Sequence, residues 1–96
     1  MMTEPKFVLA LPMSDEALLP AFVETCLAEN ASLIAVMGEG CEQVEDEIDW
    51  LIVGDGSDPD RFLTTSSHPG ETLDQVVEFA TAWWVTADGP TKIVRI

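Results

Sequence analysis

The stretch KFVLALPMSDEALLPAFVETCLAENASLIAVM, residues 6–37, decides the fold of this chain. It begins and ends with short unbroken apolar runs, KFVLAL at 6–11 and SLIAVM at 32–37. Such runs are typical of strands that are buried on both faces of a sheet. Two of them separated by a helix-sized segment predict a strand–helix–strand unit whose strands are parallel.

The segment between these runs carries the signals of a helix. Ser14 is a suitable N-cap residue, two acids follow it, and apolar residues recur at helical spacing as far as Leu27. Pro20 lies within this segment and lacks a backbone donor. We therefore expect an irregular first turn and a regular helix over residues 20–29.

The region after the second run repeats the pattern. An apolar stripe at helical spacing, with acids pointing away from it and Gly54 as its end, predicts a second helix. The stripe consists of Val44, Ile48, Leu51 and Ile52. The run WLIV at 50–53 also fits a strand, because periodicity does not separate short apolar runs.

The remainder of the chain predicts one more helix between two strands. The third strand is expected over residues 61–66, and Thr72 with Gln75 forms a capping box that begins the helix. The last strand is expected over residues 92–96, where the alternation of side chains suits a sheet edge. The apolar face of the helix comprises Leu73, Val76, Val77, Ala80 and Trp84.

This alternation of strand and helix predicts the fold class. The 96 residues contain no internal repeat and no linker, so we expect a single α/β domain over residues 1–96. The expected architecture is a three-layer Rossmann-like or flavodoxin-like βαβαβαβ arrangement, with a mainly parallel four-stranded sheet and three helices.

The charge of the chain restricts its partners. Eighteen acids against four Lys and Arg give a formal net charge of -14. Nucleic acids and anionic membranes bind clusters of Lys and Arg, so neither is an expected partner. Half of the acids lie in residues 39–60, which contain no Lys or Arg. This block, with Glu45, Asp46 and Asp49 as candidate partner-binding residues, is either a solvated face or a surface that attracts a basic protein.

The apolar runs, cysteines and aspartates of the chain bear on its localisation and on metal or cofactor binding. The apolar run at 7–11 is too short for a signal or transmembrane segment, so we expect a cytoplasmic protein. Cys26 and Cys41 do not have the spacing of a disulfide framework or a zinc site. Asp55, Asp58 and Asp60 do not match a calcium loop. The sequence therefore predicts no metal and no cofactor.

A candidate ligand site follows from the predicted sheet. In open parallel sheets, ligands bind beyond the carboxyl ends of the strands. The segments that leave those ends carry a thiol, several hydroxyls and the single imidazole of the chain. The candidate ligand-binding residues are Ser14, Cys41, Thr65, Ser66, Ser67 and His68. The glycines at 38 and 40 lack the third glycine of a dinucleotide fingerprint, and acids surround them, so a nucleotide is not expected.

The last helix has an aromatic flank. Phe79 and Trp83 lie four residues apart beside the apolar stripe. The helix is either seated deeply between its neighbours, or the two rings anchor a partner or a second copy of the chain.

The sequence at 49–80, DWLIVGDGSDPDRFLTTSSHPGETLDQVVEFA, resembles a family of small acidic bacterial proteins classed as a domain of unknown function. The resemblance implies no activity. Our leading hypothesis is a non-enzymatic binding protein, such as an inhibitor or immunity-type partner of a basic protein. The alternative is a small-ligand binder or enzyme at the strand ends, around His68, Cys41 and Ser14.

Overall fold

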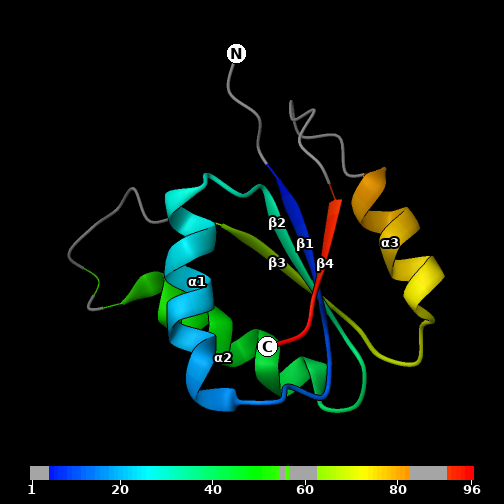
Figure 1. The fold of residues 1–96 in the computed structure, drawn as a ribbon, viewed down its shortest axis with the longest axis horizontal. Helices are drawn as coiled ribbons and strands as arrows, with labels where there is room; N and C mark the ends of the chain where they lie inside the picture. The colour runs from blue at the N-terminus through cyan, green and yellow to red at the C-terminus, as the bar shows by residue number, and fades with distance from the viewer. Residues whose placement is uncertain (1–4, 55, 57–62, 83–90) are drawn as a thin grey trace.

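The computed structural model describes residues 5–54, 56, 63–82 and 91–96 (Figure 1). These residues form the strands β1 (Lys6–Ala10), β2 (Leu33–Met37), β3 (Thr64–His68) and β4 (Thr91–Val94). The strands make one sheet in the order β3-β2-β1-β4, and every neighbouring pair is parallel. The predicted parallel four-stranded sheet is confirmed.

Helices cover both faces of this sheet. A short 3-10 turn, η1 (Glu16–Leu18), leads into α1 (Leu19–Ala28), and α2 (Cys41–Val53) and α3 (Leu73–Thr81) follow. In Figure 1, α1 and α2 lie on one side of the sheet and α3 lies on the other. The chain runs outward from β1 to β3 and then returns to the far side of β1 as β4. Right-handed crossovers in opposite directions place helices on opposite faces, which gives the predicted three-layer α/β fold.

Two apolar layers hold the structure together. Successive residues of β1 and β2 point to opposite faces of the sheet, so each strand contributes to both layers. The larger layer, under α1 and α2, includes Phe7, Leu9, Leu19, Val23, Cys26, Ile34, Val36, Ile48 and Ile52. The smaller layer, under α3, consists of Val8, Leu33, Ala35, Val76 and Ala80.

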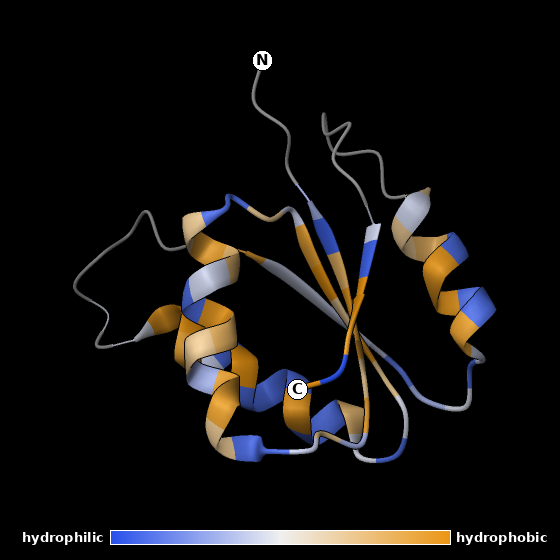
Figure 2. Ribbon diagram, viewed as in Figure 1, coloured by the Kyte–Doolittle hydropathy of each residue, from blue (hydrophilic) through white to orange (hydrophobic). Residues whose placement is uncertain are grey.

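The edge strand β3 differs from its neighbours because its residues are Thr-Thr-Ser-Ser-His. Figure 2 shows the contrast between this pale strand and the hydrophobic β2 beside it. Helix α2 packs against β3, whereas α3 packs mainly against β1, β2 and β4. The sheet therefore has a polar edge that carries most of the candidate ligand-binding residues.

Several predicted element boundaries are confirmed. The first helix begins with an irregular turn, η1, before the regular turns of α1. The N-cap of η1 is Asp15 and not Ser14, because the Asp15 carboxylate accepts a hydrogen bond from Ala17 N. Residues 50–53 are helical and belong to α2, and Gly54 is its C-cap. At the start of α3, Thr72 Oγ1 accepts a bond from Gln75 N while Thr72 N donates to Gln75 Oε1. Trp84, predicted on the apolar face of this helix, lies outside the described residues.

The predicted ends of two strands are wrong. We expected a third strand over residues 61–66, but β3 continues to His68 because β2 offers pairing partners that far. Ser67 aligns with Val36, and His68 aligns with Met37. The last strand was expected over 92–96, but β4 ends at Val94, since β1 pairs with it only as far as Leu9. Residues 61 and 62 lie outside the described part of the chain.

The loop after β2 depends on a glycine. Gly38 has φ +102°, and a Cβ at this position would lie 3.0 Å from both Cβ and the backbone oxygen of Leu11. Glycine therefore allows this loop to lie against the end of β1, and the same loop leads directly into α2.

Candidate functional site

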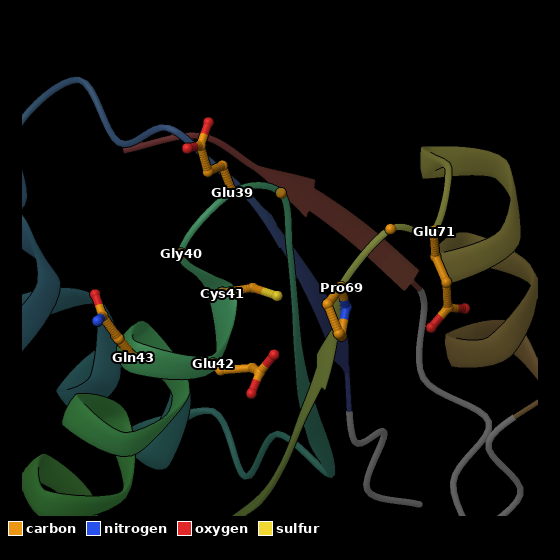
Figure 3. A pocket seen from close by; sticks show the side chains of 9 residues that line it. Glu39, Gly40, Cys41, Glu42, Gln43, Pro69 and Glu71 are labelled. Carbon is orange, nitrogen blue, oxygen red and sulfur yellow. The ribbon is translucent and has the colours of Figure 1, made fainter.

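The carboxyl ends of β2 and β3 border an open hollow of about 830 Å³. Its lining comes from two loops, Gly38 to Gln43 at the start of α2 and Pro69 to Glu71 before α3. Figure 3 shows the side chains of Cys41 and Glu42 directed toward the loop at Pro69. The Cys41 side chain is only 2% exposed. Three carboxylates, those of Glu39, Glu42 and Glu71, line the hollow, so it disfavours anions.

The single histidine lies beside this hollow, on the α3 side of β3. His68 is buried, and both of its ring nitrogens have partners. Nε2 lies 2.8 Å from Ser66 Oγ, and Nδ1 lies 2.9 Å from Glu71 Oε2. The ring of Phe79 covers the imidazole, with 4.6 Å between the ring centroids. These contacts link β3, the following turn and α3.

The next hydroxyls along β3 face the opposite way. Thr65 Oγ1 lies 2.6 Å from Asp49 Oδ1 and 3.1 Å from Glu45 Oε2, both on α2. Ser67 shares this side of the strand because side chains alternate. The structure therefore brings Ser66 and His68 together but separates them from Thr65 and Ser67.

Ser14 lies at another place on the same edge. The order of the strands reverses between β1 and β4, and this reversal is where doubly wound sheets usually bind ligands. Here the backbone oxygen of Ile96 occupies the position and accepts bonds from the backbone nitrogens of Ser14 and Asp15. The Ser14 side chain is exposed, and Ser14 is not among the residues that line the hollow beside Cys41.

A second candidate surface is the outward face of α2. At about 100° per residue, Trp50 lies about 180° from Cys41, on the side of the helix opposite the buried residues. Its side chain is 76% exposed, and Val53, one turn further along, is 52% exposed. We call this surface the acidic face of α2. It consists of Trp50 and Val53 together with the exposed acids Glu42, Asp46, Glu47 and Asp49.

The structure places the partner-binding residues predicted from sequence on different parts of the molecule. Asp46 lies on the acidic face, four residues before Trp50. Glu45 is half-buried and, like Asp49, lies within hydrogen-bonding distance of Thr65. Phe79 is 36% exposed, with its ring against His68. Trp83 lies outside the described residues, so a dimer through the last helix stays a prediction.

The buried Cys26 thiol is poorly suited to metal or redox chemistry. Burial, and to a smaller extent the charge of Glu29, raise the pKa of the Cys26 thiol from 9.0 to about 12. A thiol with such a pKa is a poor nucleophile and a poor ligand at neutral pH. Within residues 5–54, 56, 63–82 and 91–96, no group of three or more His, Cys, Asp or Glu side chains is placed to hold a metal ion.

Comparison with known families gives one match. A family described as "Domain of unknown function (DUF7684)" matches residues 5–93. The chain belongs to this family. The match covers β1, β2, β3 and all three helices, ends within β4 one residue before Val94, and includes the stretch 49–80 whose resemblance the sequence suggested. No curated protein and no solved structure matches the chain. None of the described helices has the length and apolar character needed to span a bilayer.

Sequence reasoning missed two residues that matter to these sites. Glu71 was not selected, although it follows His68 by three residues across a Pro-Gly turn, a spacing that returns a side chain toward the imidazole. Trp50 was not chosen as a partner-binding residue, although the sequence places it off the apolar stripe of its helix and among acids, which is the signal that could have found it. Once α2 is a helix to Val53, its helical position determines that it faces outward.

Proposed function

We propose that this protein is an acidic binding protein that holds a basic protein partner on the acidic face of α2, in the manner of an inhibitor or immunity-type protein. The observation that carries the proposal is Trp50, whose side chain is 76% exposed on a helix face where most of the other exposed residues are acids. Tryptophan is among the residues most enriched in the centres of protein interfaces, and leaving it in water has no benefit for the isolated fold.

The charges around Trp50 support a basic partner. Asp46 and Glu47 precede it by four and three residues, so they lie beside the indole on the helix surface. Helix α2 contains no Lys or Arg, and the ion pair between Lys92 and Glu29 lies elsewhere, joining β4 to the end of α1. An aromatic ring flanked by carboxylates attracts guanidinium or ammonium groups both by charge and by cation–π contact.

The experiment is affinity capture from native lysate of the source cell, with elution by increasing salt and identification by mass spectrometry. A specific basic protein that is retained at low salt and released at high salt is expected, because the Debye length falls from about 10 Å at 0.1 M to about 3 Å at 1 M ionic strength. Trp50→Ala bait should lose this protein although its net charge is unchanged.

A matched pair of charge variants serves as the control. Glu42→Gln with Asp46→Asn neutralises two acids on α2, and Asp74→Asn with Glu78→Gln neutralises two at the same spacing on α3. Glu42 and Asp74 both lie in the first turn of their helices, so the two variants change net charge and helix ends alike. Only the α2 variant should lose the partner. Equal loss from both variants would show that net charge alone holds the protein, and the acidic face would then be rejected.

A second candidate function is a small-ligand site, and the hollow between the ends of β2 and β3 is the observation in its favour. Its carboxylates favour an uncharged or cationic ligand. Cys41 lines it, whereas His68 and Ser14 do not. A metabolite that shifts the backbone NMR signals of Gly40 and Gly70, while leaving those of Trp50 unchanged, would support this function. Shifts confined to the part of α2 beyond Gln43 would argue against it.

A further inference from the structure

Three side chains at the β3 edge form a continuous line of hydrogen bonds. Ser66 Oγ lies 2.8 Å from His68 Nε2, and His68 Nδ1 lies 2.9 Å from Glu71 Oε2. An ionised carboxylate only accepts hydrogen bonds, so it fixes the proton of a neutral imidazole on Nδ1. Nε2 then carries a lone pair, and the Ser66 hydroxyl donates to it. This is the order of donors and acceptors that activates the nucleophile in serine–histidine–acid triads.

The three side chains of this hydrogen-bonded line are buried to different degrees, as a serine–histidine–acid triad requires. The His68 side chain is 8% exposed and lies under the Phe79 ring, so water competes little for Nε2. Glu71 is well exposed, and Ser66 is half-buried. Within the described part of the chain no strand pairs with the outer side of β3, and α3 packs mainly on the other three strands. Among the described residues, the sheet edge beside Ser66 is therefore open to a small molecule.

We propose that Ser66 is a nucleophilic serine for acyl transfer, that His68 is its general base, and that Glu71 positions the imidazole. This activity is separate from the proposed partner binding, because Ser66 lies on the α3 side of the sheet and the acidic face lies on α2. Uncharged or cationic esters are the substrate class, since Glu71 and a net charge of -14 repel anions.

The reaction balances without a further reagent except water. Ser66 Oγ bonds to the carbonyl carbon of the ester as its proton moves to His68 Nε2. The bond from that carbon to the alcohol oxygen then breaks, and the alcohol takes the proton from Nε2. Water repeats both steps on the acyl-serine, which releases the carboxylic acid and regenerates the Ser66 hydroxyl. Alternate backbone N–H groups on the free edge of β3 are candidate donors for the developing oxyanion.

The first test uses an uncharged alkyl fluorophosphonate, which labels nucleophilic serines, and locates the adduct by peptide mass spectrometry. A single adduct on Ser66 is expected. Labelling should be lost in Ser66→Ala and unchanged in Ser67→Ala, whose hydroxyl lies on the other side of the same strand. His68→Gln should slow labelling by about 100-fold, the lower end of what a general base contributes. No adduct, an adduct elsewhere, or an unchanged rate in His68→Gln would overturn the proposal.

The second test measures the tautomer of His68 by NMR, which reports the role of Glu71 separately from any effect on folding. The chain has one histidine, so its ring nitrogens give a single set of NMR signals. Nδ1 should carry the proton in the native protein, and Nε2 should carry it in Glu71→Gln, whose amide can donate to Nδ1. The same variant should label more slowly, with Glu71→Asp in between. Because Glu71 is exposed, these variants are expected to fold even if His68→Gln does not. A native Nε2–H tautomer would overturn the proposal.

Discussion

The hydroxyl of Thr65 on the edge strand lies 2.6 Å from Asp49 Oδ1 on α2. Glu45 Oε2 lies 3.1 Å from the same hydroxyl. The Thr65 hydroxyl has one proton, so it donates to only one of the two carboxylates at a time. Residues that the sequence assigned to two different surfaces, a ligand edge and a partner face, thus meet where α2 packs on β3. Part of the acidic block has a structural role.

The first prediction concerns this contact. Thr65→Val should lower the free energy of unfolding by about 1–2 kcal/mol, because it removes a hydrogen bond to a charged group while keeping the shape of the side chain. Thr64→Val is the control, since Thr64 lies on the other side of the strand, and it should change stability by less than about 0.5 kcal/mol. Urea unfolding measures both. Similar values for the two variants would mean that the bond to Asp49 contributes nothing net.

The second prediction concerns the loop after β2. Gly38→Ala should destabilise the fold by more than about 2 kcal/mol, because it combines a positive φ with a close approach of the new Cβ to Leu11. Gly40→Ala meets nothing within 4 Å and has φ +84°, so only the backbone cost of about 1 kcal/mol applies. Thermal unfolding of both variants gives the comparison. A smaller effect at Gly38 than at Gly40 would contradict the packing of this loop on β1.

The third prediction concerns alkaline pH. The pKa of the buried Cys26 thiol is about 12 in the folded protein, against 9.0 for a free thiol. Above pH 9 the unfolded chain releases this proton first, so the free energy of unfolding falls as pH rises toward 12 and is unaffected below pH 9. In Cys26→Ala this contribution is absent. Urea unfolding at pH 8 and pH 11 should therefore show a larger loss in the native protein than in the variant. Equal losses would mean that the thiol ionises without unfolding.

The fourth prediction concerns the surroundings of Trp50. Trp50→Phe should leave stability within about 0.5 kcal/mol of the native protein, since the indole is exposed. Subtracting the fluorescence of this variant isolates the emission of Trp50. Relative to their quenching of the free, uncharged N-acetyltryptophanamide, caesium ions at low ionic strength should quench that emission more effectively than iodide, because the neighbouring carboxylates concentrate cations and repel anions. A higher relative quenching by iodide than by caesium, on the same free-indole scale, would show that the acids do not dominate the field at Trp50.

The sequence by itself determined the order and nature of the elements. Unbroken apolar runs such as 32–37 can be buried only with helices on both sides, and such strands form parallel sheets. The capping box at Thr72 and the C-cap of α2 at Gly54 could be predicted from the sequence because caps are local. The hydrogen-bond partners of a cap lie within a few residues of it. The family could be recognised from 49–80 for the same reason, since a continuous stretch carried the resemblance.

Only the tertiary structure decided which side chains meet. The end of β3 depends on how far β2 extends alongside it, which no local signal in 61–66 reveals. Alternation along that strand then sends Ser66 and His68 to one side and Thr65 to the other, so six candidates predicted for one edge are divided among separate places. The bond from His68 to Glu71 and the bonds from Ser14 and Asp15 to Ile96 depend on a turn and on strand order. Both are properties of the folded chain, because contacts between distant segments are made only when the whole sheet assembles.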